Sequence, residues 1–206
     1  MNQPSSSSHR RQQGITLIVV LILLVVVTIL GIGGARIALL GERSTRFDRD
    51  HQVAWQAAEA ALIDAEYDIA GPNTSANQRM ATFAPQNTGL FLPTCGKTVA
   101  TRGLCEQSTT ATPIWAAIDF TITDPNSAPT VGFGEKTGFP FVSGTNGIQP
   151  SRLPRYIVEY VPDSRPGQDA AARPPHLPAP ILYRITSMGF GPNADVRVMM
   201  QSTFAK

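Results

Sequence analysis

The amino-acid sequence predicts an α+β fold in which one long N-terminal helix packs on a small antiparallel β-sheet. Three features lead to this prediction: residues 15–35 are apolar and uncharged, residues 36–69 continue as an alanine-rich segment with an apolar stripe, and β-branched runs alternate with turn residues near the C-terminus. A helix with one apolar stripe and a sheet with one apolar face bury these surfaces against each other. The order of the features therefore favours a helix followed by a sheet.

The first expected element is a membrane-spanning helix over residues 15–35, a run of 21 residues without a charge. At a rise of roughly 1.5 Å per residue, such a helix spans the ~30 Å hydrocarbon core of a bilayer. His9, Arg10 and Arg11 precede the run and favour a cytoplasmic N-terminus. Arginines also follow the run, so the positive-inside rule alone leaves the orientation open.

A short polar leader, residues 1–14, ends at Gly14, and Ile15 begins the apolar run. In a secretory signal peptide the apolar stretch is about 7–15 residues long, and small residues mark a cleavage site after it. In this chain the small residue lies before a longer stretch. Cleavage after Gly14 would remove the basic leader and leave the membrane helix as the new N-terminus, unlike the processing of an ordinary secreted protein.

The helix is expected to continue beyond the membrane, because residues 36–69 contain no proline and a single glycine, Gly41. Residues 53–65 are rich in good helix formers. One apolar stripe is formed, at spacings of three and four, by Trp55, Ala58, Leu62, Ala65 and Ile69. Gly71 and Pro72 supply a stop, since glycine suits the left-handed position past a helix and proline cannot continue it. The continuous helix, residues 15–69, would be about 80 Å long.

Three glycines lie late in the apolar run: Gly31, Gly33 and Gly34. They allow close approach of neighbouring helices. They also allow a weak point at which the helix bends, because each glycine costs roughly 1 kcal/mol relative to alanine. Both interpretations stay open.

The remaining residues, 71–206, predict one globular head. Segments rich in turn residues alternate there with short runs of β-branched and aromatic residues. The expected order is a long loop (72–113), a strand (114–123), a turn-rich segment (124–153), a strand (155–161), a loop (162–180), and a hairpin of two strands (181–189 and 196–204) joined by residues 190–195.

Cys95 and Cys105 are the two cysteines of the chain, and nine residues separate them. In a non-cytoplasmic domain such a pair most simply forms one disulfide, which would stabilise the fold by about 2–3 kcal/mol. The alternative is half of a metal site, which lacks a second ligand pair because His51 and His176 are far away in the sequence. A disulfide would place the head outside the cytoplasm and so settle the orientation.

Four segments of the chain together resemble the PilX family of type IV pilus minor pilins. The resemblance covers roughly the first 70 and the last 50 residues, and the Gln-Ala-Ala-Glu-Ala-Ala-Leu block is its most specific part. The segments are QQGITLIVVLILLVVVTILG, FDRDHQVAWQAAEAALIDAE, PRYIVEYV and LYRITSMGFGPNADVRVMMQSTF. The resemblance implies a type IV pilin-like fold.

The resemblance also implies a route to function. A prepilin peptidase would cut between Gly14 and Ile15 and methylate the new amine of Ile15. The subunit would reside in the inner membrane with a periplasmic head, and would then enter a pilus or its initiating tip complex, supporting pilus biogenesis, twitching and adhesion. Its partners would be other minor and major pilins, the peptidase, the inner-membrane assembly platform and a tip adhesin.

Val19 departs from the general pilin pattern, since most pilins carry a glutamate at this fifth mature position. A carboxylate in hydrocarbon costs several kcal/mol unless it is paired. In pilins the pairing group is thought to be the N-terminal amine of the preceding subunit. A subunit that starts the filament has no predecessor, so Val19 favours a priming or tip role. The alternative is that Val19 is an ordinary lipid-facing valine.

The sequence predicts no catalytic residue, no metal site and no cofactor. His51 lies beside Asp48 and Asp50 on the expected helix, and His176 lies in a proline-rich loop, neither with a nucleophile at a meaningful spacing. Acidic turns around Asp124 and over residues 163–169 lack the regular ligand spacing of a calcium loop. Glu59 and Glu66 are more typical of a solvated helix face than of a binding surface.

Charge excludes nucleic acid as an expected partner. The chain has 17 basic side chains, of which the leader holds two, against 15 acidic ones. The mature chain is therefore balanced, whereas nucleic-acid binding requires a basic patch. Two other functions stay open: a pseudopilin of a type II secretion system, and a signal-anchored extracytoplasmic enzyme or binding module.

Overall fold

One α-helix, α1, spans Ile15–Ala70 without a break. The computed structural model describes residues 15–141, 147–162 and 181–206 of the chain. The chain divides into two compact units between Arg46 and Phe47, so the C-terminal part of α1 belongs to the same unit as the head. The helix ends as predicted: Gly71 adopts a left-handed φ of 71°, and its N–H donates to the carbonyl of Tyr67 at 2.9 Å.

The head contains the predicted small sheet, which has five strands and is antiparallel except for one short parallel strand, so that it is mixed. Its long strands are β3 (Arg155–Pro162), β4 (Ile181–Phe190) and β5 (Arg197–Ala205), which pair antiparallel in this order and confirm the predicted hairpin. Two short strands also pair with β3: β1 (Leu104–Cys105), which is parallel to it, and β2 (Val131–Gly132), which is antiparallel. A two-residue strand carries no periodic signal in the sequence, which explains why β1 was missed.

The predicted strand over residues 114–123 is wrong. Its first residues form a short helix, α2 (Ile114–Ala117), directly after Pro113. The carboxylate of Asp119 then accepts hydrogen bonds from the N–H and the hydroxyl of Thr121 at 2.8 and 2.7 Å. This local turn occupies backbone that a strand would need. Two short 3₁₀-helices, η1 (Met80–Thr82) and η2 (Pro85–Leu90), lie in the predicted long loop 72–113.

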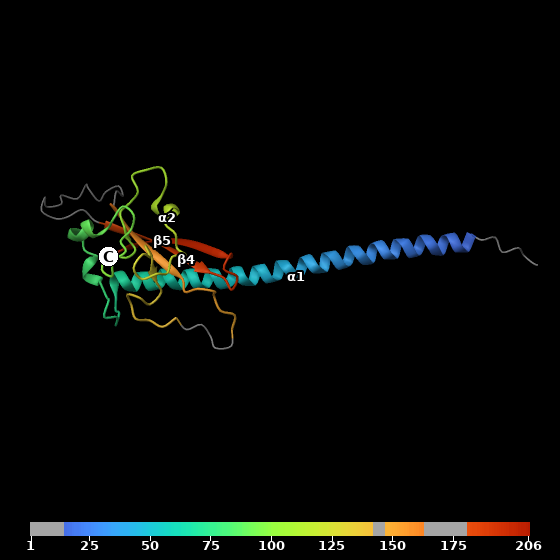
Figure 1. Cartoon of the computed structure of the whole chain (residues 1–206), viewed down its shortest axis with the longest axis horizontal. Helices are drawn as coiled ribbons and strands as arrows, with labels where there is room; N and C mark the ends of the chain where they lie inside the picture. The colour runs from blue at the N-terminus through green and yellow to red at the C-terminus, as the bar shows by residue number, and fades with distance from the viewer. Residues whose placement is uncertain (1–14, 142–146, 163–180) are drawn as a thin grey trace, which may run out of the picture. The chain divides into compact units, whose positions relative to one another are not determined.

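Hydrophobic clusters cover β3 and β4 on both faces of the sheet, whereas alternate residues of β5 are exposed. In Figure 1 the C-terminal part of α1 runs along the sheet beside β4. Residues of α1 and of the sheet share one hydrophobic cluster, whose members include Leu62, Ile69, Tyr156, Val158 and Ile185. A second cluster, which includes Ile157 and Phe190, joins the opposite face to the cysteine pair and α2. Because successive strand residues point to opposite faces, Tyr156 and Ile157 fall in different clusters.

The stripe predicted on the helix is confirmed for four residues and wrong for one. Ala58, Leu62, Ala65 and Ile69 are buried, whereas Trp55 is 42% exposed. The buried face is wider than the predicted stripe, and small residues dominate it. Its further members are Ala54, Ala57, Ala61, Asp64 and Asp68. The predicted loop over residues 162–180 starts one residue early, because Pro162 is the last residue of β3; the rest of it, residues 163–180, lies outside the described residues.

Candidate functional site

The N-terminal half of α1 exposes its apolar side chains. Every residue from 16 to 46 is exposed, and the exposed fraction reaches 58% at Leu23 and 69% at Leu30. The helix is long and apolar enough to cross a membrane. An apolar surface of this extent marks a site that lipid or another helix covers. This half is therefore the first candidate site, one for assembly rather than for chemistry.

The predicted processing residues lie at the start of this helix. Gly14 is outside the described residues, and Ile15 is the first residue of α1. Val19, at the position where the resemblance implies an acid in most pilins, is 51% exposed. Cleavage between Gly14 and Ile15 and methylation of Ile15 stay predictions.

The C-terminal part of α1 approaches β4 with backbone against backbone. A Cβ atom added at Gly189 would lie 2.0 Å from the carbonyl oxygen of Ala54 and 2.4 Å from the backbone nitrogen of Ala58. Ser187 donates from its hydroxyl to the carbonyl of Ala58 at 2.8 Å. The short separation between helix and strand therefore requires small residues such as alanine on this face of α1. Alanine also favours the helix itself.

A buried ion pair attaches the end of α1 to the segment that follows it. Arg79 donates to both carboxylate oxygens of Asp68, at 2.6 Å from Nη2 and 3.1 Å from Nε. The side chains of Arg79 and Asp68 are 4% and 0% exposed. The hydroxyl of Tyr156 donates to Asp68 at 3.0 Å, and Arg79 also donates to the carbonyl of Arg102 at 2.6 Å. Burial and the nearby Asp68 carboxylate raise the pKa of Tyr156 well above its ordinary value.

Asp64, one helical turn before Asp68, attaches α1 to the loop after β2. Its carboxylate accepts a hydrogen bond from the backbone N–H of Gly134 at 2.9 Å and another from the hydroxyl of Thr137. Asp64 is 1% exposed. Burial raises its pKa from 3.8 to about 6, the two hydrogen bonds oppose this shift, and the Asp68 charge adds to it.

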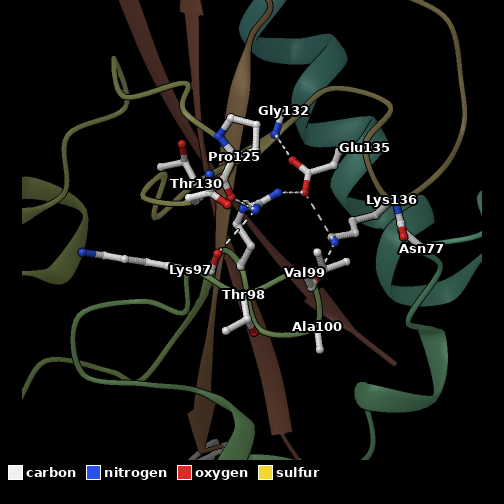
Figure 2. Close-up of polar contacts among 12 residues, drawn as sticks. Asn77, Lys97, Thr98, Val99, Ala100, Pro125, Thr130, Gly132, Glu135 and Lys136 are labelled. Atoms are coloured by element: carbon white, nitrogen blue, oxygen red, sulfur yellow. Dashed lines mark hydrogen bonds and ion pairs between the residues drawn. The ribbon is translucent and has the colours of Figure 1, made fainter.

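Further polar contacts join that loop to the loop enclosed by the two cysteines. Figure 2 shows Glu135 between the N–H of Gly132, which donates to it at 3.2 Å, and the Lys136 ammonium at 3.5 Å. Arg102 forms an ion pair with the same carboxylate. Lys136 is fully buried, donates to the carbonyl of Val99 at 2.5 Å, and has its pKa lowered by that burial.

These residues form one polar cluster, which holds α1, the loop after β2 and the cysteine loop together. We define it by its charged members, which are Asp64, Asp68, Arg79, Arg102, Glu135 and Lys136. Sequence reasoning missed all six. Asp64 and Asp68 lie on the side of the predicted stripe, where the helical period predicts exposure rather than burial. Their partners are distant in the sequence, so no local pattern could have identified the pairs.

The structure joins Cys95 and Cys105 in a disulfide, as predicted. Both residues are buried and belong to the cluster on the sheet face opposite α1. A hollow of about 620 Å³ lies beside them. Its lining includes the apolar residues Ile114 and Ile118 and the hydroxyl residues Ser108, Thr109 and Thr110.

The remaining residues considered from the sequence lie apart from one another. His51 is exposed and contacts the ring of Phe47, with 6.2 Å between ring centroids. Glu59 is exposed, as expected, and Glu66 is half-buried. His176 and the acidic turn 163–169 lie outside the described residues. In the described part of the chain, no group of three or more His, Cys, Asp or Glu residues could hold a metal ion.

Comparison with known proteins gives two family matches. The model described as PilX N-terminal matches residues 13–62, and the model described as type IV pilus assembly protein PilX C-term matches residues 101–206. The two matches together cover the apolar N-terminal half of α1, most of its buried face and the whole sheet. Neither a curated protein nor a solved structure matches the chain.

Proposed function

The chain belongs to the PilX family of type IV pilus assembly proteins, and we propose that it is a minor pilin that starts the filament at its distal end. Its head, held on α1 by the polar cluster, would contact other minor pilins or a tip adhesin. The exposed apolar half of α1 would pack with the helices of other pilins. Through this role the protein would support pilus biogenesis, twitching and adhesion.

Before assembly, the protein would reside in the inner membrane, with its N-terminus in the cytoplasm and its head in the periplasm. A prepilin peptidase would then remove residues 1–14 and methylate Ile15. Intact-mass measurement of the membrane-extracted protein tests this step. A mature chain that starts at methylated Ile15 is the expected result, whereas an intact leader would instead favour a signal-anchored module.

The proposal that the protein lies at the distal end of the filament rests on Val19. A carboxylate at this position would be costly in an apolar environment without a partner amine. A first subunit has no predecessor to supply that amine, and valine removes the cost. The exposed position of Val19 on α1 is consistent with a contact made there in the filament.

Immunogold labelling of filaments tests the position directly. We expect wild-type protein at filament ends, and we expect Val19→Glu to extend labelling along the shaft, because its carboxylate can pair with the preceding amine. Val20→Glu is the matched control, since it carries the same charge one residue away, out of line with the amine. Uniform labelling of shafts by the wild type, at the stoichiometry of the major pilin, would contradict the proposal.

A pseudopilin of a type II secretion system would share the processing and the apolar helix. The family match favours the pilus, because both matching models describe PilX proteins and one names type IV pilus assembly. Deletion of the gene separates the two functions. We expect loss of surface pili with protein secretion unchanged; loss of secretion with normal piliation would indicate the pseudopilin.

A further inference from the structure

Four arginines follow the apolar run of α1: Arg36, Arg43, Arg46 and Arg49. Two of them have acidic partners on their own helix. Arg46 forms an ion pair with Glu42 at 2.5 Å, and Arg49 forms one with Asp50 at 3.2 Å. The other two, within the described parts of the chain, have no ion-pair partner and no side-chain hydrogen bond.

The two unpartnered arginines share one face of the helix. Arg36 and Arg43 are seven residues apart, which is about two helical turns. Leu40 lies between them on that face and is 65% exposed. Toward the N-terminus, the same face continues into the apolar run through Ile29 and Ile32, which are 64% and 54% exposed. This surface is therefore apolar on one side of Arg36 and cationic on the other.

Helix geometry places both guanidinium groups at the level of lipid headgroups. Residues 15–35 span the ~30 Å hydrocarbon core, so Arg36 follows the core directly, and Arg43 lies about 10 Å farther along the helix axis. The headgroup layer is about 5–7 Å thick on each side. Helical side chains tilt toward the N-terminus, which in this chain is the direction of the membrane. The long stem of Arg43 can therefore reach back to the headgroups.

We propose that Arg36 and Arg43 form a binding site for anionic phospholipid headgroups at the boundary where α1 leaves the membrane. The guanidinium group suits this ligand, because its planar donors match phosphate oxygens in pairs. Leu40 would contact the glycerol and upper acyl region between the two arginines. Such a site holds the helix at a defined depth before assembly. The inference rests on the proposed function, in which α1 spans the membrane.

Titration of the full-length protein in a neutral detergent with short-chain phosphatidylglycerol tests the site, with calorimetry as the readout. We expect the double variant Arg36→Gln/Arg43→Gln to bind about 30-fold more weakly, or about fivefold for each arginine. The matched control is Arg46→Gln/Arg49→Gln, which removes the same charge from the two arginines that have partners. We expect its affinity to change less than about twofold, because their charges are already compensated.

Two results would overturn the inference. Equal losses in both double variants would show attraction to net charge alone, without a site. Binding of glycerol phosphate as tight as that of phosphatidylglycerol would indicate a site for free phosphate rather than for a lipid. Alkaline extraction of membranes tests the membrane span separately. Release of the wild-type protein would refute the span and, with it, the proposed function. Retention of the protein, combined with unchanged lipid affinity in Arg36→Gln/Arg43→Gln, would refute the headgroup site alone.

Discussion

Leu23 and Leu62 lie on the same helix, yet the exposed fraction is 58% for Leu23 and 8% for Leu62. The difference extends to the two parts of α1 to which they belong. From residue 16 to residue 46 every side chain is exposed and large apolar residues dominate, whereas the buried face after residue 53 is mostly alanine with two aspartates. A helix that meets lipid or other helices can use large side chains freely. A helix that touches a strand must use small ones and must supply partners for buried polar groups.

The largest effect is expected where the polar cluster is broken. Asp68→Ala leaves the Arg79 guanidinium buried without its partner and removes the acceptor of Tyr156, so the free energy of unfolding should fall by about 3–5 kcal/mol. Glu66→Ala lies on the same turn of α1, and Glu66 forms no ion pair with any residue that the structure describes, so this variant should change the free energy of unfolding by less than about 0.5 kcal/mol. Urea unfolding of the full-length protein in detergent, followed by tryptophan fluorescence, measures both. Equal small losses would mean that the cluster does not hold the head to α1.

The two leucines provide the most direct test of the difference between the two parts. Leu62→Ala should lower the free energy of unfolding of the head by about 3 kcal/mol, because it creates a cavity in the cluster between α1 and the sheet. Leu23→Ala removes the same atoms from an exposed position and should leave that transition unchanged. A comparable loss in both variants, measured by the same urea experiment, would show that the apolar N-terminal half of α1 also stabilises the head.

The pH dependence of the free energy of unfolding should reveal the raised pKa of the Asp64 carboxyl group. Its pKa is raised from 3.8 to about 6 in the folded protein, so on acidification the folded state binds a proton before the unfolded state does. Stability should therefore increase as the pH falls from about 7 to about 4, by up to about 3 kcal/mol relative to a variant that cannot titrate there.

Asp64→Asn is that variant, and the quantity to measure is the difference between its unfolding free energy and that of the wild type at each pH. The groups facing Asp64 are Thr137, Gly134 and Asp68, and all three remain in the variant. Asp119 and Asp124 have pKa values lowered by hydrogen bonds, so their effect on stability has the opposite sign. Both are present in wild type and variant, so their contribution cancels when the two unfolding free energies are subtracted. A difference independent of pH would show that the Asp64 carboxyl keeps its ordinary pKa.

A smaller effect is expected at the closest contact between helix and strand. Gly189→Ala should cost about 2 kcal/mol, since its Cβ would displace the backbone of α1 at Ala54 and Ala58. Gly89→Ala is the control, because nothing lies within 4 Å of the added atom. Thermal unfolding of the two variants measures the contrast. A Gly189 variant as stable as the control would place α1 farther from β4 than the structure does.

The extent of α1 and the positions of β3, β4 and β5 could be predicted from local patterns. An uncharged apolar run, a continuation without proline and the Gly71–Pro72 stop predict the helix to within a residue at each end. The strands carry enough β-branched residues to be found in the same way. The strand predicted over residues 114–123 failed because its composition resembles that of a strand, while Pro113 and the Asp119 carboxylate set a helical turn and a tight turn there.

Such local patterns could not predict the polar cluster or the short separation between α1 and β4. Asp68 meets Arg79 and Tyr156, which are 11 and 88 positions away, and Asp64 meets Thr137, 73 positions away. A carboxylate on a helix flank has the same local signature whether it faces water or a buried arginine. The helix and its lipid-compatible half follow from propensity and hydrophobicity, which act along the chain. Which aspartates are buried, and why alanine faces the sheet, depend on groups that only folding brings within hydrogen-bonding distance.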